Sequence, residues 1–391
     1  MRHLALILLC ACGTQLKPET LVDKLRVLSI IAEPPEVKPG QSSQLSVLQL
    51  DPNGGKTTVI WVGCEPDPFG LGRSACNDTT ALLQPTSFTT FPEGVRILGI
   101  GNRASYASSP KLFEPIAADD SNRFNGVVGP VLAVVIGEEI DPTSTNEELR
   151  ELFGRIEKQE VQSVFALSRV TVSEKDPQNQ NPRLDSLQVD GASLPKNATL
   201  QVRAGDERSL RVNATLAETY PLQLPGGVEQ REETLVAAWY STNGRFTRER
   251  VELNEESETV FIAPGAPDIP EDPVPQRRFG TLWLVLRDSR GGQAFSTLPF
   301  FVCDDALAEA EPTQVIAPSS RTQPVSVKGK NMATALDVVV NGIALQRGFY
   351  SPAQDAFLGD IPAELPAGTY TVTVRTKRCT TLETQLQLAV P

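Results

Sequence analysis

The chain has 391 residues, of which 40% are hydrophobic and 21% charged, with 31 prolines and 28 glycines; at about 150 residues per domain, this length allows two or three domains. Its formal net charge of -12 argues against the positive surface that would attract nucleic acid or an anionic bilayer. The only histidine, His3, lies in a segment that we expect to be removed, which excludes histidine-based catalytic triads and histidine-ligated metals from the mature chain.

Residues 1–12 are the first predicted element, a signal peptide. Arg2 and His3 precede an apolar run from Leu4 to Ala11, which is far shorter than the ~20 apolar residues that a membrane-spanning helix needs. A short cationic region followed by a short apolar region is typical of a secretory signal. Such a signal can direct either lipidation of the exported protein or its ordinary secretion. An apolar N-terminus that is buried in the fold is the third alternative.

The end of this segment, residues 9–12 with the sequence Leu-Cys-Ala-Cys, resembles the lipobox of bacterial lipoproteins. The resemblance implies that Cys12 becomes the new N-terminus and carries a diacylglycerol, for which palmitate is a suitable label. Two or three acyl chains, at about 0.8 kcal/mol per buried methylene, anchor a protein firmly to a membrane. Gly13, where retained lipoproteins have aspartate, implies transport to the outer membrane, and residues 13–24 would form a tether.

Four cysteines remain in the mature chain: Cys64, Cys76, Cys303 and Cys379. Four cysteines allow three pairings. The first two enclose a loop rich in proline and glycine that can bring its ends together, so we expect them to form one disulfide and the last two to form the other. Exported proteins favour disulfides over free thiols. Four unrelated buried thiols are the alternative, and the C-x2-C spacing of a zinc site is absent.

The loop between the first two of these cysteines, residues 65–75, is the candidate recognition loop. Phe69 and Leu71 occupy its tip and Arg73 follows them. Binding residues are often carried on loops at the end of a rigid scaffold, and exposed apolar side chains mark such sites. A closed loop with no binding role is an equal alternative.

Residues 25–173 predict an antiparallel β-sandwich, because short apolar or alternating runs are separated by turn residues. A helical insertion is expected at residues 145–159, where Thr145 precedes Glu148 by three positions and forms a capping box. The helix presents an apolar stripe that we expect to cover one end of the sandwich, made of Leu149, Leu152, Phe153 and Ile156. A partner-binding helix is the alternative.

The glycines at positions 99 and 101, with Ala104, match the G-x-G-x-x-A pattern of dinucleotide-binding proteins. That pattern binds pyrophosphate only where a helix begins at the glycines. The sequence after them reaches a proline within a few residues. A strand kinked by glycine is therefore the better interpretation.

Residues 174–182 are polar and contain prolines and asparagines, which predicts a linker with nothing to bury. Residues 183–303 then repeat the strand pattern and end in a predicted hairpin that turns at 288–292. Trp239 and Trp283 lie in mid-strand, where we expect them to fill the core between two sheets. The strand with Trp239, the hairpin and the length resemble the immunoglobulin-like and PKD-like modules of bacterial surface proteins.

Residues 304–311 predict a second linker, and residues 312–391 contain four strand-like segments in series. A strand that ends in Gly329 and Asn331, and a closing segment Leu-Pro-Ala-Gly-Thr-Tyr at 365–370, resemble an IPT/TIG domain. The alternation after this segment places three residues on one face of the last predicted hairpin: Tyr370, Val372 and Val374.

No metal, cofactor or catalytic residue is assigned from the sequence. Acidic pairs recur along the chain, and Asp304 with Asp305 at a predicted domain junction is the pair best placed for Ca²⁺. None of them follows the regular ligand spacing of a calcium loop. Acidic loops are mostly solvated surface, which is the interpretation we adopt.

The sequence thus predicts an all-β protein of three antiparallel, immunoglobulin-like β-sandwich domains in tandem, with one short helical insertion in the first. We expect a non-catalytic lipoprotein that acts as a binding, adhesion or scaffolding stalk at the bacterial cell envelope, with an envelope protein or a glycan as partner and no role in nucleic-acid binding. The alternatives are a carbohydrate-active hydrolase that uses paired carboxylates, and a subunit of an envelope secretion or attachment assembly.

Overall fold

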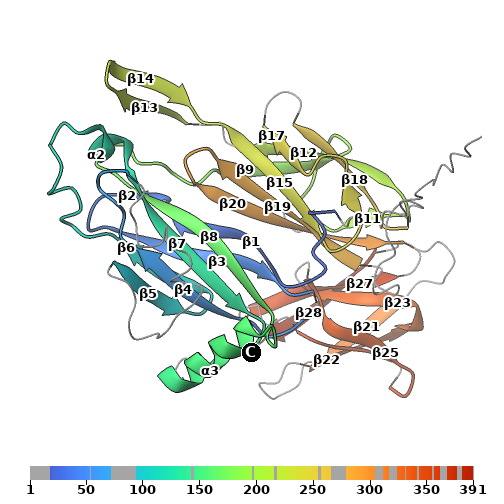
Figure 1. Ribbon diagram of the computed structural model, residues 1–391. Coiled ribbons are helices and arrows are strands. Elements are labelled where there is room, and N and C mark those ends of the chain that lie inside the picture. The colour runs from blue at the N-terminus through green and yellow to red at the C-terminus, as the bar shows by residue number, and fades with distance from the viewer. Residues whose placement is uncertain are drawn as a thin grey trace, which may run out of the picture.

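The structure is a computed structural model, and the residues that it describes are 18–52, 54–71, 94–141, 145–195, 198–214, 218–253, 257–265, 279–303, 311–316, 324–330, 332–340, 343–354, 356–361, 368–376 and 381–390. Within these ranges, strands make up nearly all of the regular structure (Figure 1). The strands form three pairs of sheets in tandem, so the prediction of an all-β chain of antiparallel sandwiches is confirmed. We call the three pairs the first, second and third module.

The first module packs a three-stranded sheet on a five-stranded sheet. The smaller sheet has the order β1 (Arg26–Glu33), β3 (Ser42–Leu50), β6 (Arg103–Ala107), and the larger has the order β2 (Glu36–Val37), β8 (Ser163–Val172), β7 (Val127–Ile136), β4 (Thr58–Cys64), β5 (Val95–Ile100). Trp61 and Tyr106 are fully buried between the sheets. Every residue of β4 is buried, because both faces of this sheet are covered.

Helix α3 (Asn146–Glu157) covers the outer face of the larger sheet, rather than one end of the sandwich as the sequence suggested. The predicted capping box is confirmed, since Thr145 and Glu148 bond each other's backbone. Leu152 and Ile156 are buried against strands β4 and β7. The side chains of the other two residues of the stripe, Leu149 and Phe153, lie outside the described residues. A shorter helix, α2 (Ser121–Asn125), precedes β7.

The glycine motif lies in a strand, a turn and a second strand, so the nucleotide-binding interpretation is excluded and the kinked strand is confirmed. Gly99 belongs to β5, and the chain passes through Gly101, which has a φ of 112°, into β6. The indole N–H of Trp61 donates to the Gly101 carbonyl at 2.7 Å. The turn therefore carries the chain from one sheet of the first module to the other.

The second module packs two five-stranded sheets and adds a two-stranded ribbon. One sheet has the order β10 (Ala192–Ser193), β9 (Leu184–Val189), β12 (Glu207–Ala214), β18 (Glu258–Ile262), β16 (Arg245–Phe246). The other sheet has the order β11 (Leu200–Val202), β20 (Gln293–Val302), β19 (Phe279–Asp288), β15 (Leu235–Ser241), β17 (Arg250–Glu252). The ribbon consists of β13 (Thr219–Leu224) and β14 (Gly227–Glu232). The predicted hairpin is confirmed as β19 and β20, with Arg287 opposite Gln293. Trp239 fills the core as predicted, 5.8 Å from the ring of Phe246.

The third module packs two four-stranded sheets (shown in red in Figure 1). They have the orders β21 (Glu311–Ile316), β22 (Pro324–Lys330), β26 (Ala356–Asp360), β25 (Gln346–Ser351) and β24 (Ile343–Ala344), β23 (Ala335–Val340), β27 (Gly368–Thr376), β28 (Thr381–Val390), with a 3-10 turn at Met332–Thr334. Val372 and Val374 are fully buried and Tyr370 packs against the same core, as the alternation predicted. The Arg375 guanidinium lies 5.0 Å from the Phe301 ring centroid, which brings the third module against the second.

The first two modules pack side by side through strands β15 and β19 of the second (Figure 1). Trp283 does not lie in the core between the two sheets of its own module, which corrects the prediction. In the register of β15 and β19, Trp283 is opposite Tyr240, and both side chains pack on Leu28 of the first module. Trp239 points to the other face of the same sheet. The continuous apolar run of β19 thus reflects burial on two faces.

The segment before β1, expected to be the end of a tether, is docked on the second module where it is described. Leu21 forms a parallel bridge with Ser241, and the Val22 N–H donates to the Ser241 carbonyl at 2.8 Å. Thr20 and Val22 are buried. The described part of the predicted tether, residues 18–24, therefore belongs to the folded protein.

Candidate functional site: the groove between the first two modules

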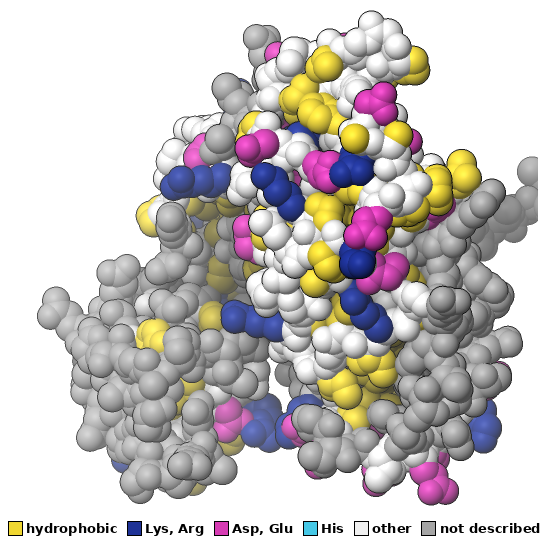
Figure 2. Space-filling view, turned by 90° about the vertical axis from the view of Figure 1, so that its left-hand side faces the viewer, with side chains coloured by type: hydrophobic (Ala, Val, Ile, Leu, Met, Phe, Trp, Pro, Cys, Tyr) yellow, Lys and Arg dark blue, Asp and Glu magenta, His cyan; other side chains and the backbone are white. Residues whose placement is uncertain are grey.

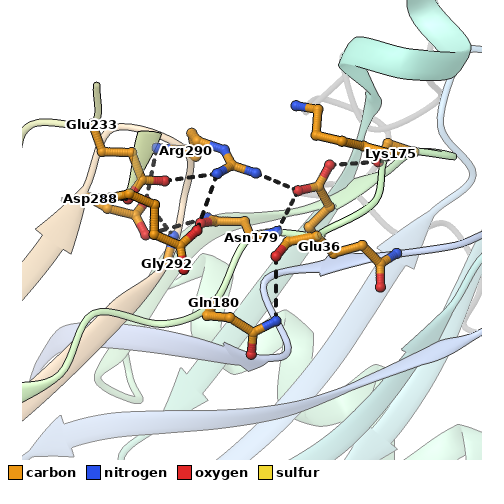
Figure 3. A network of polar contacts seen from close by, with 11 residues as sticks. Glu36, Lys175, Asn179, Gln180, Glu233, Asp288, Arg290 and Gly292 are labelled. Atoms are coloured by element: carbon orange, nitrogen blue, oxygen red, sulfur yellow. Dashed lines mark hydrogen bonds and ion pairs between the residues drawn. The ribbon is translucent and has the colours of Figure 1, made fainter. Parts of the chain in front are cut away.

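Residues 174–182, predicted to be a linker with nothing to bury, run through the centre of the interface between the first two modules. The side chains of Lys175 and Asn179 are only 3% and 1% exposed. The sequence suggested a solvated segment because its residues are polar. In the structure they are buried because charged and polar groups surround them and bond to them (Figure 3). These partners come from distant parts of the chain, so the local sequence does not reveal them.

Glu36, on the short strand β2, is the anionic centre of this network. One carboxylate oxygen accepts from the Ser173 hydroxyl at 2.6 Å. The other accepts from the Asn179 backbone N–H at 2.6 Å and from the Arg290 guanidinium at 2.7 Å. Burying a carboxylate without such hydrogen-bond partners would cost free energy. Glu36 thus links the first module, the segment 174–182 and the second module.

Arg290, in the turn between β19 and β20, is the cationic centre. Besides Glu36, it contacts the Glu233 carboxylate at 3.1 Å and the Glu218 carboxylate at 3.4 Å. The Tyr220 ring centroid lies 4.6 Å from the guanidinium carbon, which adds a cation–π contact. Burial raises the pKa of the Glu233 carboxyl above its ordinary value. Arg290 therefore joins the ribbon, the hairpin and the first module.

Asp288 holds the turn that carries Arg290. One of its carboxylate oxygens accepts from the backbone N–H groups of Arg290 and Gly292, both at 2.8 Å. The other accepts from the Asn179 side-chain amide at 3.3 Å. A Cβ at position 292 would lie 2.1 Å from the Asp288 carboxylate, so only glycine fits there. The turn is thereby fixed to the segment 174–182.

Lys175 closes the network on the side of helix α2. Its ammonium lies 5.7 Å from the Phe124 ring centroid and 5.3 Å from that of Tyr220. Burial lowers the pKa of the Lys175 ammonium from its ordinary value. Aromatic faces replace the water that a cation would have on an open surface.

Three further hydrogen bonds cross the interface on its other side. The Arg287 guanidinium donates to the Leu28 carbonyl at 2.7 Å, and the Ser29 hydroxyl donates to the Gln293 side chain at 2.8 Å. Asn181 accepts from the Gln293 backbone N–H at 2.8 Å. The first two bonds join β1 to the β19–β20 hairpin, and the third joins the segment 174–182 to β20. Together with the polar network, they fix the two modules relative to each other.

An open groove of about 400 Å³ lies beside this interface, between the larger sheet of the first module and the β19–β20 hairpin. Its apolar lining includes Val128 and Leu167, which are 45% and 67% exposed. Arg169 and Arg287 supply positive charge. A second space of about 230 Å³, between β1 and β8, shares Leu167 and Arg287 with it. The two spaces form one groove, and exposed apolar side chains with a few convergent polar groups are typical of a binding site.

The predicted recognition loop lies elsewhere on the first module. Phe69 and Leu71 are 50% and 61% exposed, and the backbone N–H groups of both donate to the Asp67 carboxylate at 3.0 Å. Arg73 falls outside the described residues. The face of the molecule in Figure 2 shows hydrophobic side chains in several small groups among Lys, Arg, Asp and Glu side chains. The described part of that face therefore has no dominant sign of charge.

The remaining predicted site residues are described only in part. Cys64 ends β4 and Cys303 follows β20, and both are buried. Cys12, Cys76, Cys379, Asp304 and Asp305 lie outside the described residues. The disulfide pairing and the calcium site thus stay predictions. Among the residues that the structure describes, no three His, Cys, Asp or Glu side chains come together as metal ligands.

Carboxylates in two of the acidic pairs that recur along the chain, Asp119 with Asp120 and Glu138 with Glu139, have structural partners. Asp120 caps helix α2 by accepting from the Asn122 backbone N–H at 2.8 Å. Glu138 forms an ion pair with Arg155 of helix α3. In the described part of the chain, no helix has the length and hydrophobicity that a membrane-spanning segment requires.

No protein family model and no curated protein matches this chain. Among solved structures, it is similar to SGBP-B of the Bacteroides ovatus mixed-linkage glucan utilization locus, in complex with a mixed-linkage heptasaccharide (10% identity, TM-score 0.16, covering 95% of this chain and 70% of that chain). It is also similar to the three N-terminal domains of the outer capsid protein Hoc of bacteriophage RB49 (10% identity, TM-score 0.19, 92% and 95%). A third similarity is to the Ig1-2 module of the Drosophila receptor protein tyrosine phosphatase DLAR (10% identity, TM-score 0.20, 71% and 98%). At these scores, the similarities carry no inference about a ligand.

No motif in the sequence marks the groove residues as a binding site. One signal was present in strand β8, where apolar residues occur on both faces although only one face is needed for the core: Val164 and Ala166 pack inward, while Phe165 and Leu167 are exposed. A strand that is apolar on both faces predicts cover on both sides. The partners of Arg290 had no local signal.

Proposed function

We propose that this chain is a non-catalytic binding protein of the bacterial cell envelope, anchored to the outer membrane through Cys12, which holds an envelope protein or a glycan in the groove between its first two modules. The observation that carries this proposal is the groove itself, where Leu167 and Val128 remain exposed beside Arg169 and Arg287. Ligand sites occur preferentially at junctions between domains. The buried network around Arg290 supports the proposal, because rigid walls reduce the entropy that binding costs.

The lipid anchor rests on the lipobox-like residues 9–12. Five residues lie between Cys12 and Pro18, where the described chain begins. Fully extended, the six residue-to-residue steps from Cys12 to Pro18 span about 20 Å. Acylated Cys12 would therefore hold the docked segment, and with it the second module, near the membrane surface.

The other predicted features belong to the same proposal. Disulfides between Cys64 and Cys76, and between Cys303 and Cys379, would fix the start of the loop 65–75 and the end of strand β20. That loop, with Phe69, Leu71 and Arg73, is a second candidate contact for the partner. We propose further that the third module is IPT/TIG-like, on the pattern of residues 365–370.

Binding through the groove is tested with the purified chain and two matched variants. Leu167→Arg places a charge in the groove, whereas Val228→Arg places the same charge at an exposed apolar position of the ribbon. A glycan array and solubilised envelope proteins serve as probes. The wild type and V228R should retain one and the same component that L167R loses. Retention of that component by L167R, or capture of nothing by the wild type, would contradict binding in the groove.

The anchor is tested separately by palmitate labelling and membrane fractionation of the wild type and Cys12→Ala. The wild type should incorporate the label and sediment with outer membranes, while C12A should do neither. An unlabelled wild type removes the anchor from the proposal and leaves the groove untouched.

A further inference from the structure

The groove has a second property besides its exposed side chains: one of its walls is an unpaired strand edge. Strand β8 pairs with β7 along its whole length, but with β2 only at Thr171 and Val172. In the described part of the chain, no strand pairs with this edge over residues 163–169. An open edge presents a row of backbone donors and acceptors to a further strand.

The hydrogen bonds already present show which residues point outward from this edge. The Thr171 N–H donates to the Pro35 carbonyl at 3.0 Å, on the side of β2. Backbone direction alternates along a strand that pairs in antiparallel fashion, so residues separated by two share a side. The N–H and C=O groups of Phe165, Leu167 and Arg169 therefore point away from β7. Strand β8 thus offers three outward-facing N–H and C=O pairs upstream of the residues that pair with β2.

These backbone groups border the groove. Leu167 lines both of its parts, and Ser168 and Ala166 flank Leu167 in the smaller part, facing β1. Outward-facing residues recur every two positions, which is about 6.8 Å along a strand. Only another main chain repeats alternating donors and acceptors at that spacing. The geometry favours an extended polypeptide over a sugar.

The side chains add a preference for negative charge. Arg169 and Arg287 line the groove, and among the described residues neither is in an ion pair. The chain as a whole carries a net charge of -12, but these two arginines bring positive charge to the groove. Leu167 and Arg169 are two residues apart on one strand face. A peptide with an apolar residue next to Leu167 and a carboxylate next to Arg169 would complement them.

We propose, on the basis of the groove function above, that the partner is an extended acidic peptide segment that adds to β8 as a further strand. Its main chain bonds the outward-facing groups of Phe165, Leu167 and Arg169, and its carboxylate pairs with Arg169 and Arg287. Recognition by strand addition gives affinity through the main chain and selectivity through alternate side chains.

The probe is a hexapeptide with the sequence Thr-Val-Thr-Asp-Thr-Val, acetylated at its N-terminus and amidated at its C-terminus. Two matched probes replace the aspartate by lysine, or N-methylate alternate backbone amides so that one edge loses its donors. Binding to the purified full chain is measured by isothermal titration. We expect the aspartate probe to bind at least tenfold more tightly than either matched probe. Equal binding of the three, or no binding of the aspartate probe, overturns the inference.

Protein variants place the peptide on β8. Leu167→Pro removes an outward N–H, and Leu167→Ala keeps that N–H while removing the side chain. Because this N–H makes no bond to β7, L167P should keep the wild-type melting temperature within a few degrees. We expect L167P to lose more than tenfold in affinity and L167A clearly less. Arg169→Glu should reverse the preference between the aspartate and lysine probes. Equal affinities of L167P and L167A, or an unchanged preference in R169E, contradict strand addition.

The test separates this inference from the function on which it rests. If the wild type and V228R retain a glycan that L167R loses, and the hexapeptides do not bind, the groove is a binding site and the peptide inference is wrong. If the aspartate probe binds and L167P does not weaken it, the peptide binds elsewhere.

Discussion

Arg290 and Glu36 form a buried ion pair across the boundary of the first two modules, with 2.7 Å between their charged atoms, although 254 residues separate them in the chain. Arg290 also contacts Glu233, which is buried as well. One guanidinium thus neutralises two buried carboxylates. This arrangement bridges the two modules where they pack side by side.

Removal of Arg290 should destabilise the protein strongly. In Arg290→Met, Glu36 and Glu233 stay buried without their cation, and breaking a buried pair in this way costs about 3–5 kcal/mol of unfolding free energy. Arg347 pairs with Asp360 on the surface and is 86% exposed, so Arg347→Met should cost about 1 kcal/mol or less. Urea denaturation of both variants measures the two costs. Similar values for the two would show that the network does not hold the modules together.

The segment 174–182 should resist protease in the native protein. Lys175 is buried between two aromatic rings, and trypsin needs an exposed, locally unfolded backbone to cut after it. We expect no early cleavage after Lys175 in the wild type, and faster cleavage there in R290M. Peptide masses over a time course of digestion report both. Rapid cleavage after Lys175 in the wild type would indicate a solvated linker.

One side chain of the first module, Asn125, should contribute to holding the ribbon β13–β14. The Asn125 side chain donates to the Gln223 carbonyl and accepts from the Gln223 N–H, both at 2.8 Å. Asn125→Ala removes both bonds, at a net cost of about 1 kcal/mol, or a roughly fivefold faster exchange of the Gln223 amide. Gln230→Ala, on the exposed strand β14, is the control and should leave exchange at Gln223 unchanged. Equal exchange in N125A and the wild type would show that the ribbon is held by other contacts.

The burial of Lys175 predicts a pH dependence of stability. Because the pKa of the Lys175 ammonium is lowered in the folded protein, the unfolded chain binds more protons between that lowered pKa and the ordinary value of 10.5, and stability rises with pH in this window. Below that lowered pKa both states are protonated, so the full cost of burying the ammonium beside Glu36, Glu233 and Arg290 is present. Lys175→Met lacks this cost.

K175M should therefore be more stable than the wild type at pH values below the lowered pKa of Lys175, and the difference should shrink as the pH rises from there towards 10.5. Denaturation of both proteins at several pH values measures the difference in their unfolding free energies. The contributions of the other titrating groups are common to both proteins and cancel in this difference. A difference that is constant over this range would exclude Lys175 as its source.

The sequence determined the local structure because local structure depends on neighbouring residues. Thr145 and Glu148 predicted the start of helix α3, the turn at 288–292 predicted the β19–β20 hairpin, and alternation placed Val372 and Val374 in one core. Each of these signals lies within a few positions of the structure that it specifies. The exposure of Phe69 and Leu71 was likewise visible, since both follow turn residues directly, whereas the role of their loop in recognition stays a prediction.

Only the tertiary structure decided what covers each face. Trp283 looks like a core residue in the sequence, and residues 174–182 look like a linker, but Trp283 packs on Leu28 and the side chain of Asn179 bonds Asp288. Periodicity shows that a face is buried, yet it carries no information on the partner. The partners here are more than 100 positions away in the chain. The groove exists because of the way in which the first two modules are placed against each other. No local sequence pattern encodes this placement.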